Sequence, residues 1–292
     1  MCQRSFVSNV TRSSGVVRSR KGRAVVADED LGNRFVAALE PVDLAPNLAE
    51  RVLLQQSCQK RFDHRKLCRH AALIYNAVKF LFELHENRIS QIDLLIVTHF
   101  DKDHIGGVPE VLDSVWVLRV IEPDYKPENP EAEAYTAYRA ALDTAGITPE
   151  AISDALEVTL GDMQLSILGA GSTIYEKNAD NNNSLVVTVT HCENRFFFAG
   201  DIEKQRIKRL LETGVFGCDV LKVPHHGAYN KQLPALFAAL GMKTAVITCS
   251  EKNPAGEETL DALDALGCRI WQTANGTVRI LSTKNGITVS QK

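Results

Sequence analysis

Four side chains that can bind a metal ion lie within six positions of the sequence, at His99, Asp101, Asp103 and His104. The whole chain contains only eight histidines, so chance does not account for this grouping. Alternate residues of an extended segment point to the same side, and His99 and Asp101 can therefore share one cation. Asp103 and His104 follow as the chain turns and can reach a second cation nearby. The alternative is a solvated loop in which Asp103 caps a helix.

Two later segments carry polar residues where an apolar run ends. Asp201 follows the apolar residues 196–199, and His225 and His226 follow residues 220–223. The carboxyl ends of strands gather at one edge of a sheet, so these side chains can converge with the first group on one pocket. An aspartate at a strand end is also a common helix N-cap, which is the alternative for Asp201. Convergence of the three segments predicts a two-metal site.

Strands and helices in alternation must position these residues. Residues 92–97 form an apolar run typical of a buried strand, and residues 71–84 repeat apolar side chains at helical spacing. The pattern predicts a hairpin over residues 156–168 that turns at Gly161-Asp162. Further strands are expected at residues 115–121, 185–190, 196–199, 220–223, 243–248, 269–272, 277–281 and 287–290, and helices at 130–145, around 207–211, at 233–240 and at 257–266. Such a chain is of the α+β class, with two sheets packed together under helices.

The block from His99 to His104 resembles the metal-binding signature of the metallo-β-lactamase fold, with aspartate in place of the commoner histidine at its third position. Three later segments are similar to those of the soluble domain of ComEC-type DNA-internalisation proteins, at residues 182–185, 198–201 and 221–227. The resemblance covers residues 71–292 and implies an αββα four-layer sandwich. Phosphorylcholine esterases of the same fold carry a similar signature.

This resemblance implies a role for each residue of the site. His99 and Asp101 would bind one metal ion. Asp103 and His104 would bind the other ion, and Asp201 would bridge the two.

Other assignments stay open within the resemblance. Either His225 or His226 would complete the second metal site, and the other could protonate a leaving group. Asn183 stands where many relatives place a histidine ligand, so the first metal would be held more loosely. Asp103 and His226 are the residues expected to be catalytic. Lys222, beside the histidines, is considered as a contact for a substrate phosphate.

The chemistry expected of this site is hydrolysis of a phosphodiester, with nucleic acid among the candidate substrates, by a metal-bound hydroxide. Two divalent cations about 3.5 to 4 Å apart lower the pKa of bound water toward about 7 and stabilise the charge that grows on phosphorus. Zinc is the expected metal, and manganese is the alternative because three aspartates suit a harder ion. Two other interpretations are a hydrolase of a small choline phosphoester, thioester or lactam, and a metal-binding scaffold without turnover.

The composition excludes several classes of protein. The 292 residues are 45% hydrophobic and 24% charged, which is enough apolar material for a large core and excludes a disordered chain. No stretch reaches the roughly 18 to 20 apolar residues of a membrane helix. Seven scattered cysteines without a Cys-x-x-Cys pair predict reduced thiols and a cytoplasmic location.

The amino-terminal part of the chain differs from the rest. Residues 1–26 contain six basic and no acidic side chains, so the net charge of −3 leaves −9 on the remaining chain. Relatives begin with strands carrying Gly-Gln-Gly-Asp and Asp-Gly-Gly, and neither motif occurs before residue 71. The leading strands of the first sheet are therefore expected to be missing or replaced. We predict an unassigned basic segment, disordered or altered, at residues 1–70 and a hydrolase domain at residues 71–292.

Overall fold

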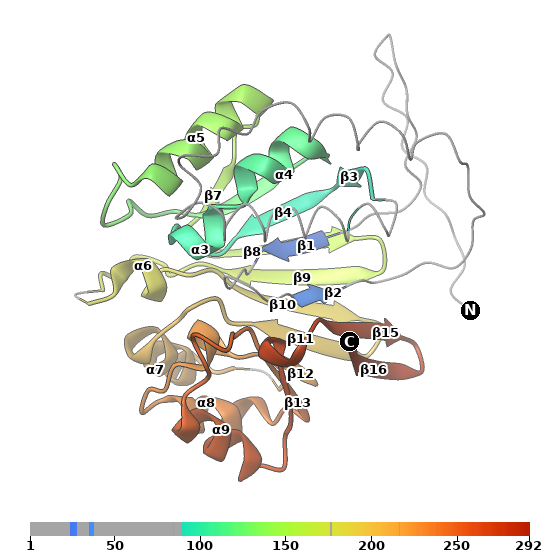
Figure 1. Ribbon diagram of the computed structural model, residues 1–292. Helices are drawn as coiled ribbons and strands as arrows, with labels where there is room; N and C mark the ends of the chain where they lie inside the picture. The colour runs from blue at the N-terminus through green and yellow to red at the C-terminus, as the bar shows by residue number, and fades with distance from the viewer. Residues whose placement is uncertain (1–23, 28–34, 38–83, 85–88, 176, 216) are drawn as a thin grey trace.

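Two β-sheets pack face to face between two layers of helices in the computed structural model of the protein (Figure 1). The structure describes residues 84, 89–175, 177–215 and 217–292, together with the backbone of residues 24–27 and 35–37. One apolar core lies between the sheets, and one lies between each sheet and its helices. The αββα four-layer sandwich that the resemblance predicts is therefore confirmed.

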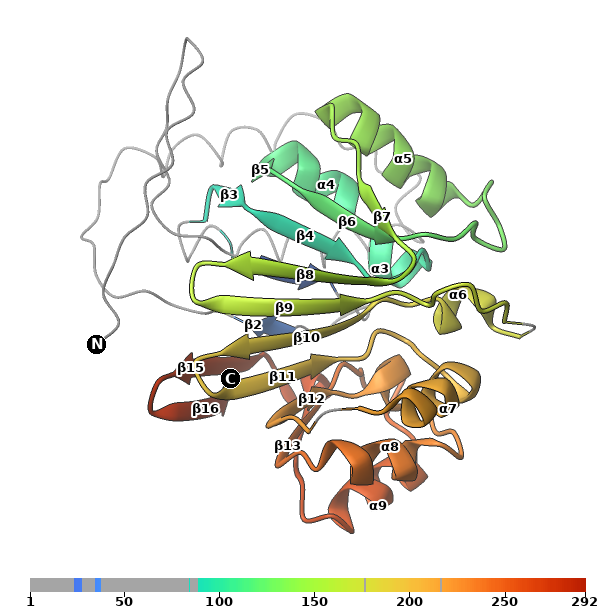
Figure 2. The ribbon, with the colours of Figure 1, turned by 180° about the vertical axis from the view of Figure 1, so that it is seen from behind.

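The larger sheet has seven strands in the order β14-β13-β12-β11-β10-β9-β8, and its hairpins lie side by side in Figure 2. Neighbours from β8 to β11 are antiparallel, and neighbours from β11 to β14 are parallel. The strands are β8 (Ala155–Leu160), β9 (Met163–Leu168), β10 (Val186–His191), β11 (Asn194–Phe198), β12 (Val220–Lys222), β13 (Thr244–Ile247) and β14 (Arg269–Gln272).

The first sheet has four strands in the order β1-β4-β6-β7. They are β1 (Ala24–Ala27), β4 (Leu94–Val97), β6 (Val120–Pro123) and β7 (Glu150–Ile152). A three-stranded sheet has the order β16-β15-β2, from β16 (Gly286–Gln291), β15 (Val278–Thr283) and β2 (Phe35–Ala37). A two-stranded sheet joins β3 (Gln91–Ile92) to β5 (Trp116–Val117).

Helices cover both outer faces of the sandwich. The first sheet is covered by α3 (Lys102–Ile105), α4 (Val108–Ser114) and α5 (Glu133–Ala145), and the second by α7 (Lys204–Thr213), α8 (Leu233–Leu240) and α9 (Glu257–Asp264). The short helix α6 (Ala179–Asn182) lies at the end of the sandwich (Figure 1).

Strand β4 shows why its sequence is apolar without interruption. Leu94 and Ile96 contribute to the core between the sheets, whereas Leu95 and Val97 contribute to the core under helices α3 to α5. Alternate side chains of a strand point to opposite faces, and here both faces are buried. The strand therefore ends only where the polar cluster begins.

Most of the predicted elements are confirmed, with shifted ends. The hairpin of β8 and β9 turns at Gly161, whose φ of 57° is in the left-handed region that glycine adopts readily. The strand predicted at residues 115–121 is wrong as a single strand, because β5 pairs with β3 and β6 pairs with β4. The helix predicted at residues 71–84 lies outside the described residues except for Leu84, which is helical and buried.

Two short strands from within residues 1–70 join the sheets. β1 pairs in parallel with β4 at one edge of the first sheet, and β2 pairs in parallel with β15. Residues 24–27 and 35–37 thus lie at edges of these sheets. The expectation that the usual leading strands are missing or replaced stays a prediction. The domain boundary at residue 70 stays a prediction. Among the described residues, no helix combines the length and apolar character needed to cross a membrane.

Candidate metal centre

Three strand ends deliver the predicted ligands to one edge of the sandwich. His99 follows β4, Asp201 follows β11, and His226 follows β12. β11 and β12 are parallel neighbours, so their carboxyl ends share an edge. The backbone N–H of Leu185 donates to the carbonyl of Thr98 at 2.8 Å and ties the second sheet to the end of β4. The convergence predicted for the three segments is therefore present.

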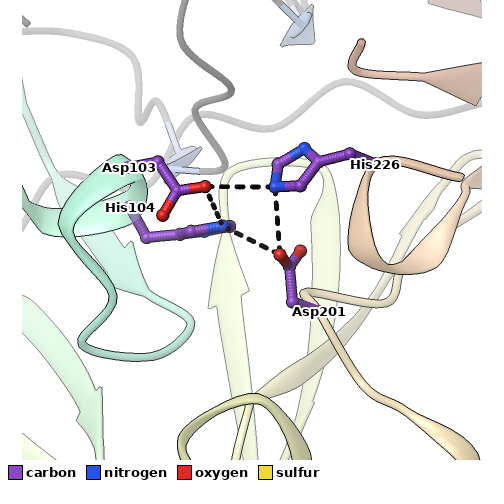
Figure 3. A group of neighbouring side chains, drawn as sticks. All are labelled: Asp103, His104, Asp201 and His226. Carbon is purple, nitrogen blue, oxygen red and sulfur yellow. Dashed lines mark ion pairs between the residues drawn. The ribbon is translucent and has the colours of Figure 1, made fainter. Parts of the chain in front are cut away.

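Asp103, His104, Asp201 and His226 point toward one another (Figure 3), and one ligand atom from each lies within 4.8 Å of the other three. Oδ2 of Asp201 lies 3.3 Å from Nε2 of His104 and 3.0 Å from Nε2 of His226. Oδ2 of Asp103 lies 3.3 Å from Nε2 of His226 and 3.8 Å from Nε2 of His104. Four donors about 2.1 Å from one tetrahedral ion would lie about 3.4 Å apart. This spacing fits one divalent ion.

His99 and Asp101 form a second group beside these four residues. Nε2 of His99 lies 3.7 Å from Oδ2 of Asp101, so the two side chains face each other as the alternation predicts. The rings of His99 and His104 have centroids 3.9 Å apart. His99 is completely buried, and its Nε2 makes no hydrogen bond with the residues that the structure describes. Burying a ring nitrogen without a partner costs free energy of folding, and a bound cation would supply that partner. The pair of His99 and Asp101 therefore fits a second cation.

Two threonines orient the histidines from behind. Oγ1 of Thr98 lies 3.3 Å from Nδ1 of both His99 and His104. Nδ1 of His226 lies 3.0 Å from the carbonyl oxygen of Thr248 and 3.1 Å from its Oγ1. A carbonyl oxygen only accepts, so Nδ1 of His226 donates and Nε2 is the atom turned to the carboxylates. The roles of both threonines could not be predicted from the sequence, where the signal for Thr98 is only its place between the strand and the motif.

Opposite charges offset the burial of the site. Burial alone would raise the pKa of Asp103, but the hydrogen bond to His226 and the charge on His104 lower it to about 2. Burial also opposes the charge of Asp201, yet His104 and Lys222 hold its pKa well below the usual range. Burial would lower the pKa of His226, but hydrogen bonds to Asp103 and Asp201 raise it to about 11. The apo site therefore holds ionised carboxylates beside a protonated imidazole.

The neighbouring residues His225 and His226 separate in an unusual turn. Their φ angles are 45° and 53°, a left-handed region that side chains other than glycine rarely adopt. His225 turns away from the cluster, and its Nδ1 lies 3.1 Å from Oε1 of Glu203. This hydrogen bond lowers the pKa of Glu203 to about 2 and raises the pKa of His225. Asn178 and Asn181 donate further hydrogen bonds to Glu203.

Two residues have roles that the sequence did not indicate. Glu203 was missed because its partner lies on another strand end, and its only signal was its place just after Asp201. Lys222 is fully buried, with Nζ 3.4 Å from Oδ1 of Asp201, so the hypothesis that it contacts a substrate phosphate is wrong. The side-chain Nδ2 of Asn183 donates to the carbonyl oxygen of Ala179 at 2.8 Å. The ligand role of Asn183 stays a prediction.

The start of helix α7 excludes the alternative role of Asp201. The helix is capped by Asn182, whose Oδ1 accepts hydrogen bonds from the backbone N–H groups of Glu203 and Arg206 at 3.1 Å each. Asp201 therefore does not cap this helix. Its carboxylate faces His104 instead.

Two curated proteins match part of this chain in sequence. The ComE operon protein 3 of Bacillus subtilis is 29% identical over 196 residues, which are 65% of this chain and 25% of that protein. Recombination protein 2 of Haemophilus influenzae is 23% identical over 163 residues, 56% of this chain and 18% of that protein. The chain thus spans a quarter or less of the length of these curated relatives.

Solved structures of low identity also match. Igni18, a metallo hydrolase from Ignicoccus hospitalis, has a TM-score of 0.42 at 15% identity and covers 69% of this chain and 80% of its own. The metallo-beta-lactamase fold protein YhfI from Bacillus subtilis has a TM-score of 0.40 at 11% identity, with 72% and 83% covered. The family model of the metallo-beta-lactamase superfamily matches residues 72–250, which is more than half of the chain. The chain belongs to the metallo-beta-lactamase superfamily.

Proposed function

We propose that this chain is a metal-dependent hydrolase that cleaves phosphodiester bonds with two divalent ions. Members of its superfamily are mostly metal-dependent hydrolases. The observation that carries the proposal is the group of two imidazoles and two carboxylates whose ligand atoms lie within 4.8 Å of one another.

One ion would be held by the four-residue group of Asp103, His104, Asp201 and His226. His99 and Asp101 would hold the second ion. When bound, such ions lower the pKa of water and stabilise the charge that grows on phosphorus. Zinc suits the imidazole ligands, and manganese suits the carboxylates.

The charges of the site favour an anionic ester over a neutral amide. Two divalent ions would outweigh the three carboxylates of Asp101, Asp103 and Asp201. The buried ammonium of Lys222 lies against Asp201 and adds to the positive side. A singly charged phosphodiester would be attracted to such a site, and a strand of nucleic acid is one substrate of this class.

His225 is the imidazole that we assign to the substrate. His226 lies among the metal donors, which leaves His225 as the other member of the pair. One third of the side chain of His225 is exposed, and Glu203 holds its Nδ1. Its Nε2 is then the ring atom available to a phosphate oxygen or a leaving oxygen.

The test is to measure the metal content of the purified protein and its cleavage of bis(4-nitrophenyl) phosphate. We expect about two ions per chain and a loss of roughly 100-fold or more in turnover for Asp103→Asn, which keeps the shape but removes the charge. Single-stranded DNA, a choline phosphoester, a thioester and a lactam are compared in parallel. Cleavage of only the last three would favour a small-substrate hydrolase. Bound metal without cleavage of any of them would favour a scaffold.

A further inference from the structure

Lys222 places an ammonium group directly behind the candidate metal centre. Its side chain is fully buried at the end of β12, between Leu221 and Val223 in sequence. Nζ lies 3.4 Å from Oδ1 of Asp201 and 3.3 Å from the carbonyl oxygen of Gly200. A lysine is almost never fully buried unless its charge is paired. This lysine therefore has a specific electrostatic partner.

The two oxygens of Asp201 have different partners. Oδ1 lies toward Lys222, and Oδ2 lies 3.3 Å from Nε2 of His104 and 3.0 Å from Nε2 of His226. The lysine thus holds the carboxylate from behind and leaves one oxygen for an ion at the cluster. Asp201 is itself only 2% exposed, so water does little to stabilise its charge.

We propose that Lys222 is a positioning residue that holds one oxygen of Asp201 and leaves the other facing the four-residue group, and that its charge makes metal binding weaker than it would otherwise be. This inference rests on the proposed function in one respect, that ions bind the four-residue group, and does not depend on ester cleavage. In the apo protein the ammonium supplies countercharge that an ion would supply in the loaded protein. Once ions are bound, the same ammonium repels them across the carboxylate.

A countercharge role and a purely structural role for Lys222 predict different effects of its replacement on metal affinity. If Lys222 only packed the core, replacing it would destabilise the apo and the loaded protein equally, and metal affinity would not change. If it supplies countercharge, its replacement destabilises the apo protein more than the loaded one. By linkage, the variant then binds metal more tightly than the unaltered protein.

The test uses the full chain with Lys222→Met, which keeps the length of the side chain, and Lys222→Gln, which can still donate hydrogen bonds. Lys208→Met is the matched control. Lys208 is exposed on helix α7, and its Nζ lies 3.7 Å from Oε1 of Glu212. Melting temperature is measured with and without zinc, and zinc affinity is measured by competition with a chelating dye. We expect both Lys222 variants to lose roughly 5 °C or more as apo proteins. We expect their zinc dissociation constants to fall by roughly tenfold or more, with no change for Lys208→Met.

Weaker or unchanged zinc binding in both Lys222 variants would overturn the proposal. So would variants recovered neither with nor without zinc, because ions should replace the missing charge. A variant that folds only with zinc would support it. If the unaltered protein binds zinc but cleaves no ester, the proposed function fails while this inference stands on the affinities. If the unaltered protein binds no zinc, both are contradicted.

Discussion

The rings of His225 and His226 lie 6.0 Å apart and contact different parts of the site. His226 approaches Oδ2 of Asp201, whereas His225 pairs with Glu203. The cause is the left-handed turn at these two residues, which sends consecutive side chains in different directions. Two residues that look equivalent in sequence therefore have different partners, as the separate roles proposed for them require.

Alanine at each of these histidines should separate the roles. His226→Ala removes a ligand, so bound zinc after dialysis should fall from about two ions per chain to about one, as expected for a site that has lost one of its four ligands. His225→Ala should keep both ions and lose turnover. Bound metal is measured by mass spectrometry and turnover by phosphodiester cleavage for both variants. Equal loss of metal in the two would contradict the separation.

Zinc binding should release protons at neutral pH. The pKa of His226 is raised to about 11 in the apo site, because its hydrogen bonds to Asp103 and Asp201 outweigh burial. A zinc ion needs the neutral imidazole, so it must displace this proton, and affinity should rise about tenfold per pH unit below that pKa. We expect about one proton to be released from His226 when an ion binds the four-residue group. Calorimetric titration in two buffers of different ionisation enthalpy measures this number. A heat of binding that is the same in both buffers would argue against the arrangement.

Glu203→Gln should destabilise the fold in a defined pH window. The pKa of Glu203 is lowered from 4.5 to about 2, so its contribution is present above pH 4.5 and is lost as the pH falls toward 2. The pKa of His225 is raised above 6.5, so its contribution is present below pH 6.5 and is lost as the pH rises through the folded value. Urea unfolding of the apo protein near pH 5.5 should show a loss of about 2 kcal/mol, with smaller losses at pH 3 and pH 9. A loss independent of pH would mean that the pair contributes only by packing.

Gly227→Ala should disturb the turn that carries His226. Gly227 has a φ of 81°, and an added Cβ would lie 2.9 Å from the side chains of Ala255 and Ile247. We expect a loss of about 3 kcal/mol in the free energy of unfolding, together with weaker zinc binding.

Gly241→Ala is the matched control for this prediction. Gly241 has a similar φ of 59° at the end of helix α8, but within the described part of the chain no other atom lies within 4 Å of an added Cβ. Only the backbone cost of about 1 kcal/mol should appear, and zinc binding should be unchanged. Equal losses in the two variants would show that crowding at Gly227 has no effect.

Much of the fold could be predicted because it depends on local patterns. The strand at Leu94–Val97 is apolar on both faces, and Leu233–Leu240 repeats apolar residues at helical spacing, so each element has its own signature. The division of residues 116–123 between two sheets could not be predicted in this way, because each half pairs with a different strand. Pairing partners are chosen by tertiary packing and leave no mark in the local pattern.

The sequence by itself determined which residues could bind metal and that each follows a strand, because side-chain chemistry and strand periodicity are properties of neighbouring residues. Only the tertiary structure decided that His226 enters the four-residue group, that Glu203 holds His225, and that Lys222 lies behind Asp201. The pairs Lys222–Asp201 and His225–Glu203 join residues just over 20 positions apart, and His226 meets Asp103 from more than 120 positions away. These distances in space depend on a left-handed turn and on the pairing of parallel strands.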